Sequence, residues 1–149
     1  GGIRPADEKP QHLAVTGTLT INNSVLLAQI REELCLGYLD WYFGDRNQAL
    51  AYFKAANQHY EDLQYDEPAS FQHEVHNTYG LALLLSGQPE AALNIVDRGL
   101  VPYPNQLDSV YIRVEALKML DKPDELRKAQ KHLSTLMSFG DINPSSKTF

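Results

Sequence analysis

Residues 37–49 read GYLDWYFGDRNQA, and residues 80–92 read GLALLLSGQPEAA. Both stretches follow one pattern, Gly-x6-Gly-x4-Ala. Each small residue has a steric reason: the first glycine lets two helices approach closely, and the second supports a tight turn. The alanine faces the partner helix, where a larger side chain would push the two helices apart. The pattern therefore predicts two pairs of helices, each joined by a short turn.

Helical periodicity extends well beyond these two stretches. Apolar residues recur at spacings of three and four from Val25 to Trp41 and again from Ala49 to Ala56. Pro89 and Pro123 suit the first turn of a helix, and a break falls at residues 66–68. We expect no strand and six helices joined by short loops. The first helix is expected from about residue 22 to the turn at Gly44, and the second includes residues 49–56. The other four are expected over about residues 69–85, 89–100, 106–120 and 123–138.

The two ends of the chain differ in composition from the middle. Residues 1–21 hold Gly, Pro and charged residues, followed by a Thr-rich segment at residues 14–20 that could be briefly extended. We interpret residues 1–21 as an irregular arm or linker and residues 22–139 as the helical repeat domain. Residues 140–149 are polar and are expected to form a tail.

The spacing of the turns indicates a repeat. Thirty-four residues separate Gly87 from Asp121, which is the tetratricopeptide period, and 43 separate Gly44 from Gly87. Leu36-Gly37, Ala49 and Phe53 match the Leu-Gly and Ala-x3-Phe elements of that family, and Tyr79-Gly80, Ala92 and Pro104 match in the second unit. Over about residues 30–139, the chain thus resembles the tetratricopeptide repeat (TPR) family.

The third unit departs from the family pattern. Val114 and Leu126 occupy positions of small residues, and Asp121 replaces the turn glycine. Terminal repeats are commonly atypical. The resemblance implies an all-α solenoid of three antiparallel helix hairpins, a TPR-like superhelix. A related family of helical-hairpin repeats is the main alternative, and a generic helical bundle is another.

The resemblance also implies where a partner binds. The first helices of the hairpins line a concave groove, in which TPR proteins hold an extended peptide or a helix. The groove is expected to be aromatic at one end, although core packing is an equal alternative for Trp41. Its middle is expected to be apolar, which favours a helix or a hydrophobic segment as ligand over a charged one. The partner-binding residues expected on this basis are Arg31, Leu34, Tyr38, Trp41, Tyr42, Asn77, Leu81, Leu84, Tyr111 and Glu115.

The function expected from the resemblance is that of an adaptor or scaffold that binds a protein or peptide partner. One alternative is a secretion-type chaperone for a hydrophobic client segment. Another is a self-associating structural module, for which a homodimer would form. The compartment stays open, with the cytoplasm slightly favoured over a periplasmic or other extracytoplasmic location.

The remaining sequence features argue against other classes of protein. A formal net charge of −6 opposes binding to nucleic acid or to an anionic membrane surface, and no apolar run is long enough to insert into a bilayer. The single cysteine excludes an internal disulfide and a cysteine-rich metal site. The spacing of His73 and His76 does not fit the metalloprotease motif, and no phosphate loop or nucleophile motif occurs. We therefore predict no enzyme activity, no catalytic or metal site, and no cofactor.

Overall fold

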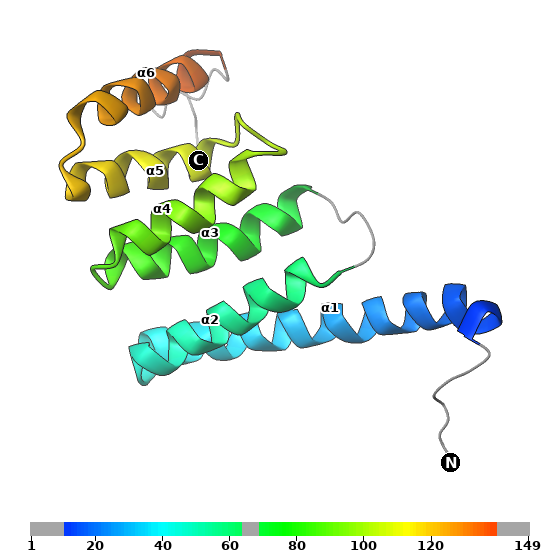
Figure 1. Ribbon diagram of the computed structural model, residues 1–149. Coiled ribbons are helices and arrows are strands. Elements are labelled where there is room, and N and C mark those ends of the chain that lie inside the picture. Colours follow the sequence, from blue (N-terminus) through cyan, green and yellow to red (C-terminus); the bar gives the residue numbers. More distant parts are fainter. Residues whose placement is uncertain (1–10, 64–68, 140–149) are drawn as a thin grey trace, which may run out of the picture. The chain divides into compact units, whose positions relative to one another are not determined.

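The computed structural model describes residues 11–63 and 69–139 of the 149-residue chain, and its regular elements there are six α-helices and no strand (Figure 1). This confirms the all-α prediction. The predicted tail at residues 140–149 and the break at residues 66–68 lie outside the described residues. The helices are α1 (Gln11–Phe43), α2 (Arg46–Glu61), α3 (Ala69–Leu85), α4 (Pro89–Leu100), α5 (Leu107–Leu120) and α6 (Pro123–Phe139).

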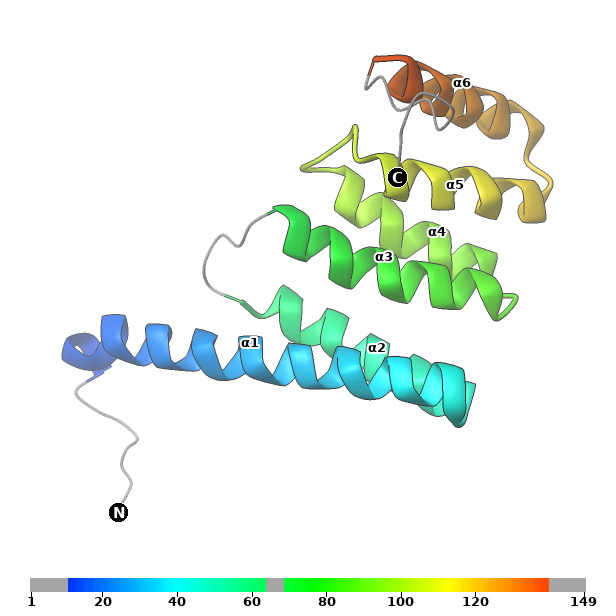
Figure 2. The same ribbon diagram turned by 180° about the vertical axis from the view of Figure 1, so that it is seen from behind.

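The helices form two compact units. One unit holds α1 and α2, which lie side by side in both views of the chain (Figures 1 and 2). The other holds α3 to α6, in which each helix contacts the next and α3 also contacts α5. The single repeat domain that the sequence predicts over residues 22–139 stays a prediction.

Helix α1 starts earlier than the sequence pattern predicts. It begins at Gln11 and runs through residues 14–20, which corrects the prediction of an irregular arm over residues 11–21. Threonine and valine each cost a helix less than about 0.7 kcal/mol relative to alanine, and elongation of an existing helix is far easier than nucleation. A helix formed downstream can therefore extend through a Thr-rich segment. Residues 1–10 lie outside the described residues.

Apolar stripes hold α1 and α2 together. The buried positions on α1 recur every three or four residues, the spacing that places side chains on one helix face. At the start of α2, the Asp45 side chain accepts a hydrogen bond of 2.9 Å from the Asn47 backbone N–H and caps the helix. The buried side chains of this unit include Ile30, Leu34 and Trp41 from α1 and Ala49, Phe53 and Ala56 from α2.

The first glycine of each Gly-x6-Gly-x4-Ala stretch lies where two helices meet. A Cβ atom at Gly37 would fall 2.3 Å from Cε1 of Phe53, and one at Gly80 would fall 2.8 Å from Cγ1 of Val96. In both pairs the contacted residue is 16 positions further along the chain. The two helix pairs therefore repeat the same contact at the same register, as the pattern of small residues predicts.

The turns of the second unit also repeat. Gly87 has a φ of 79° and Asp121 a φ of 54°, both in the left-handed region. In each turn that residue donates its N–H to the carbonyl three residues back, and the next residue donates to the carbonyl five residues back. This pair of bonds ends a helix in the Schellman motif. Asp121 thus adopts the conformation of the glycine that it replaces.

Gly44 behaves differently from Gly87. Among the described residues, Gly87 is the glycine with a positive φ, so Gly44 does not share the left-handed conformation of the Gly87 turn. A Cβ at Gly44 would instead fall 2.5 Å from Oδ1 of Asp40. Gly44 therefore makes room for the preceding helical turn of α1.

Helix α5 is the most enclosed element of the second unit, because it contacts α3, α4 and α6. Its buried residues are Ser109, Val110, Ile112, Val114, Ala116 and Leu117. On α6, in contrast, only Ala129 is buried, and it packs with Val114 and Leu117 beneath Leu93, Leu126 and Leu133. The large side chains Val114 and Leu126 thus fill this junction, where the first two helix pairs have small residues.

The Gly80 contact makes a testable prediction about stability. Gly80→Ala should lower the free energy of unfolding by about 1–3 kcal/mol through overpacking against Val96. The higher helix propensity of alanine should offset up to about 1 kcal/mol of that loss. Val96→Ala removes the clashing methyl group, so the double variant should lose less stability than the sum of the single variants. Urea unfolding followed by circular dichroism measures all three, and strictly additive losses would contradict the proposed contact.

The turn at Asp121 gives a second prediction. Asp121→Gly relieves a left-handed conformation that costs an L-residue about 1–2 kcal/mol, partly offset by the larger backbone entropy of glycine in the unfolded chain. We expect a net gain in unfolding free energy of about 0.5–1 kcal/mol. Asp124→Gly in the first turn of α6 is the matched control and should be destabilising. A loss at Asp121 as large as the loss at Asp124 would refute the role of the turn.

Candidate functional site

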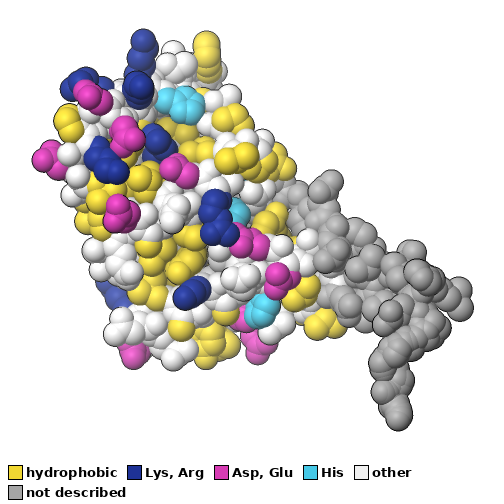
Figure 3. Space-filling view, in the orientation of Figure 1, with side chains coloured by type: hydrophobic (Ala, Val, Ile, Leu, Met, Phe, Trp, Pro, Cys, Tyr) yellow, Lys and Arg dark blue, Asp and Glu magenta, His cyan; other side chains and the backbone are white. Residues whose placement is uncertain are grey.

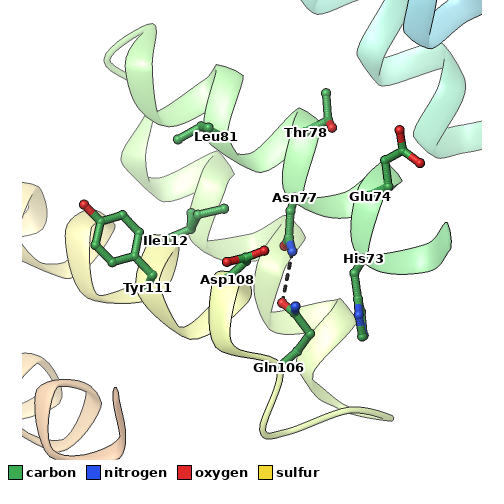
Figure 4. Close-up of a pocket in the computed structure, with 9 residues that line it drawn as sticks. All are labelled: His73, Glu74, Asn77, Thr78, Leu81, Gln106, Asp108, Tyr111 and Ile112. Atoms are coloured by element: carbon green, nitrogen blue, oxygen red, sulfur yellow. Dashed lines mark hydrogen bonds between the residues drawn. The ribbon is translucent and has the colours of Figure 1, made fainter. Parts of the chain in front are cut away.

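The candidate site is a pocket of about 500 Å³ between α3 and the start of α5 (Figure 4). Its volume lies within the usual range for sites that hold a small molecule or a few side chains, about 300–1,000 Å³. Apolar and polar groups both contribute to its walls. The lining residues are His73, Glu74, Asn77, Thr78 and Leu81 from α3, and Gln106, Asp108, Tyr111 and Ile112 from the beginning of α5.

A hydrogen-bond network fixes the two walls of the pocket to each other. Asn77 donates from Nδ2 to Oε1 of Gln106 at 3.0 Å, and the same oxygen accepts from the backbone N–H of Ser109 at 2.7 Å. The Ser109 hydroxyl, which is buried, lies 2.8 Å from both Oδ1 of Asn77 and Oε1 of Gln106. Gln106 therefore caps α5 and also joins α5 to α3, so the pocket has a preformed shape.

The charged groups that line the pocket are both acidic. Glu74 and Asp108 contribute carboxylates, and no lysine or arginine is among the lining residues. Both side chains are exposed, and neither takes part in an ion pair within the described part of the chain. Among the described residues, the pocket therefore combines two carboxylates with no lysine or arginine.

The neighbouring surface is arranged differently. Figure 3 shows basic and acidic side chains interspersed over the region of α5 and α6. Here Lys118 lies 3.1 Å from Glu115, Lys122 lies 3.9 Å from Glu125, and Arg127 pairs with Asp124. These three carboxylates have nearby cations, whereas Asp121, like Glu74 and Asp108, takes part in no ion pair within the described part of the chain.

His73 forms the wall between this pocket and a smaller hollow beside Tyr103. The His73 and Tyr103 rings meet edge to face, with centroids 5.1 Å apart. Burial lowers the pKa of His73, and the Asp108 carboxylate opposes that shift. Its Nε2 is shielded from solvent and has no hydrogen-bond partner among the described residues. His73 is therefore a mostly uncharged part of the wall at neutral pH.

His76 lies one helical turn further along α3 and belongs to the core, with 5% of its surface exposed. A Cβ at Gly99 would fall 3.3 Å from Cδ2 of His76, so the absence of a side chain on α4 makes room for the imidazole. Burial, followed by the nearby charges of Arg98 and His73, lowers the pKa of His76 to about 4. His76 is neutral at physiological pH and serves packing.

Three of the predicted partner-binding residues are in the core. Leu34 is 5% exposed, Leu84 is 7% exposed, and Trp41 is 9% exposed. The guanidinium of Arg46 stacks on the Trp41 ring, 4.2 Å from its centroid, and its Nε donates to the Trp41 carbonyl at 3.3 Å. Neighbouring side chains cover all three, which corrects the expectation that Leu34 and Leu84 face a groove. For Trp41 the burial agrees with the alternative of core packing.

The other predicted residues are at the surface, but only some share the pocket. Asn77, Leu81 and Tyr111 line it together. Glu115 pairs with Lys118 outside it. In the first unit, Arg31 and Tyr42 are exposed, and the half-exposed Tyr38 packs edge to face on Phe53 with ring centroids 5.4 Å apart. The structure thus brings Asn77 and Leu81 of α3 together with Tyr111 of α5.

Six lining residues were not among the partner-binding residues expected from the sequence: His73, Glu74, Thr78, Gln106, Asp108 and Ile112. Glu74 lies seven positions before the expected Leu81, and Asp108 lies three positions before the expected Tyr111. Residues at those spacings share a helix face, so this signal was present. The side-chain bond from Gln106 to Asn77 joins residues 29 apart and has no signal in the sequence.

The described residues contain no group of three or more His, Cys, Asp or Glu side chains arranged to hold a metal ion. None of the described helices combines the length and the apolar character that crossing a membrane requires. No family model, curated protein or solved structure matches this chain.

The low pKa of His76 predicts how stability depends on pH. Below pH 6.5 the unfolded chain binds a proton at His76, whereas the folded chain does so only below about 4. The free energy of unfolding should therefore fall as the pH drops from 6.5 to 4, by up to about 3 kcal/mol from this group. Urea titrations at a series of pH values measure the loss.

His76→Gln provides the control for that experiment. It removes the titrating group, so the loss between pH 6.5 and 4 should shrink relative to that of the unmodified chain. Between pH 7 and 8 the two chains should show parallel behaviour, because His76 is neutral there in both states. An equal acid loss in both chains would show that His76 is not its source.

Proposed function

We propose that this chain is a protein-interaction module of the tetratricopeptide type, which holds an extended peptide or a helix of a partner protein. The pocket between α3 and α5 is the proposed binding site in the second unit. The proposal includes the arrangement of the helix pairs as three antiparallel hairpins in a solenoid, and it assigns the chain a binding role and not a catalytic one.

The main observation behind the proposal is which helices supply the residues that line the pocket. They come from α3 and α5, which are the first helices of two successive helix pairs. In the family that the sequence resembles, these helices line the groove that holds the ligand. Asn77, Leu81 and Tyr111, which the resemblance assigns to that groove, are all among the lining residues.

The chemistry of the walls supports a peptide ligand. Leu81 is 42% exposed and Tyr111 is 51% exposed, so both offer apolar surface to a partner. Tyrosine is enriched at the energetic centres of protein interfaces, because it combines a large apolar ring with a polar hydroxyl. The polar groups beside them can bind the backbone or the polar side chains of a peptide.

Repetition within the fold supports the tetratricopeptide assignment. The contact of Gly37 with Phe53 recurs as that of Gly80 with Val96, and the turn at Gly87 recurs at Asp121. A bundle with chance similarity would have no reason to repeat both a helix contact and a turn at matching positions. These repeats favour a helical repeat protein.

Selection from a library of random peptides displayed on phage tests the proposal. The unmodified chain should retain peptides, and Leu81→Ser should weaken the binding of a selected peptide about tenfold, because burying a leucine side chain contributes about 1.5–3 kcal/mol. Fluorescence anisotropy of the labelled peptide gives the dissociation constants.

Met137→Ser is the matched control for this measurement. Met137 is 37% exposed, close to the 42% of Leu81, and does not line the pocket. The control should bind the peptide as the unmodified chain does, and circular dichroism should show both variants to be helical. Failure to select any peptide, or equal binding by both variants, would argue against the proposed site.

A further inference from the structure

We propose that the pocket between α3 and α5 selects a basic side chain, arginine or lysine, from the bound segment of the partner protein. The inference rests on the proposed function and adds the chemical class of residue that the site recognises. The sequence pattern alone favours a hydrophobic ligand for this part of the groove. The pocket retains that apolar surface and adds two carboxylates to it.

Charge complementarity identifies the ligand. Asp108 and Glu74 line the pocket without an ion pair in the described structure, and no lysine or arginine is among the described lining residues. The opposing effect of Asp108 on the pKa of His73 indicates that its charge acts within the pocket. An anionic ligand would meet uncompensated repulsion here, whereas a guanidinium or ammonium group would form charge-assisted hydrogen bonds. The net charge of −6 also favours the approach of a cationic segment.

The apolar surface suits the stem of such a side chain. Lysine and arginine carry three or four methylene groups, which pack on apolar surface while the charged end meets a polar group. Leu81, which is 42% exposed, offers aliphatic surface for this stem. Tyr111 lies on the same side of the pocket (Figure 4), and a cation over its ring would gain about 0.5–2 kcal/mol.

The position of Asp108 makes it the principal anchor. In Figure 4 its side chain lies between Ile112 on α5 and Asn77 on α3, whereas Glu74 lies at the edge of the pocket. Asn77 in turn is bound to Gln106, directly before α5. The carboxylate therefore projects from a helix start that the network holds in place, which lowers the entropic cost of binding a ligand.

The experiment has to distinguish ligand binding by Asp108 from a purely structural role of its carboxylate. Asp108 lies in the first turn of α5, where a carboxylate stabilises a helix through its dipole. Asp124 holds the same position in α6, directly after the first residue of the helix, and lies outside the pocket. Replacing either with asparagine removes one charge from the start of a helix. Only Asp108→Asn removes charge from the pocket.

The experiment uses the phage selection of random peptides against the full chain. The inference expects the selected peptides to share an arginine or lysine. By fluorescence anisotropy, Asp108→Asn should bind such a peptide about tenfold more weakly, since a hydrogen bond to a charged group contributes about 1.5–3 kcal/mol. Asp124→Asn should bind it unchanged, and Glu74→Gln should cause a smaller loss than Asp108→Asn.

A second change, made in the peptide, tests whether the Asp108 carboxylate interacts with the positive charge of the peptide. Citrulline in place of the peptide's arginine, or acetyl-lysine in place of lysine, removes the positive charge and keeps the length of the side chain. It should weaken binding to the unmodified chain and have little further effect on Asp108→Asn. This double-mutant cycle measures the interaction energy between Asp108 and the peptide side chain, and a general loss of protein stability would not produce such an interaction energy.

Each result has a defined meaning. Selected peptides without a shared basic residue, or equal losses in Asp108→Asn and Asp124→Asn, would overturn this inference while leaving the proposed peptide-binding function in place. No selected peptide at all would overturn both. Enrichment of a basic residue, with a loss specific to Asp108→Asn, would establish the inference.

Discussion

The close approach of paired helices at a glycine is the constraint on which the rest of this structure depends. At Gly37 and Gly80 the facing side chain occupies the space that a Cβ would need. Interiors of proteins are packed as densely as organic crystals, so a Cβ added there would force the facing side chain or its helix to move. At Gly80 the facing side chain is Val96 on α4, whereas Ile112 Cγ2 would lie 4.0 Å from that Cβ, which is an ordinary contact. A larger residue at Gly80 would thus press on α4.

Local signals made most helix boundaries predictable. Pro89 and Pro123 each begin a helix, as their missing N–H and fixed φ suggest, and the α3 range of Ala69–Leu85 agrees with the sequence prediction. The start of α1 was not predictable in this way. Its Thr-rich segment resembles an extended stretch by composition, but intrinsic propensities differ by only a few tenths of a kcal/mol per residue. Such differences cannot decide whether a helix of 33 residues ends or continues.

The face of each helix was easier to predict than the depth of its burial. The resemblance to a repeat family assigned Leu81 and Tyr111 to a groove, and both line the pocket. The same resemblance assigned Leu84 to the groove, although it is in the core, as is Trp41, for which core packing was an equal alternative. Spacing gives the direction of a side chain from the helix axis, whereas burial depends on the neighbouring elements and side chains. For Trp41, the cover includes the guanidinium of Arg46 from the start of α2.

The electrostatics of the pocket explain how a fold can keep an uncompensated carboxylate. A carboxylate at a helix start interacts favourably with the free backbone N–H groups there, so Asp108 does not need a cation from its own chain. Asp124, at the equivalent position of α6, has the same advantage and also pairs with Arg127. The stability of the two helices therefore does not explain why Asp124 has an ion-pair partner and Asp108 has none among the described residues. In the absence of such a pair, the Asp108 charge stays in a pocket that also includes the exposed surface of Leu81, where a ligand would replace water at little cost to the fold.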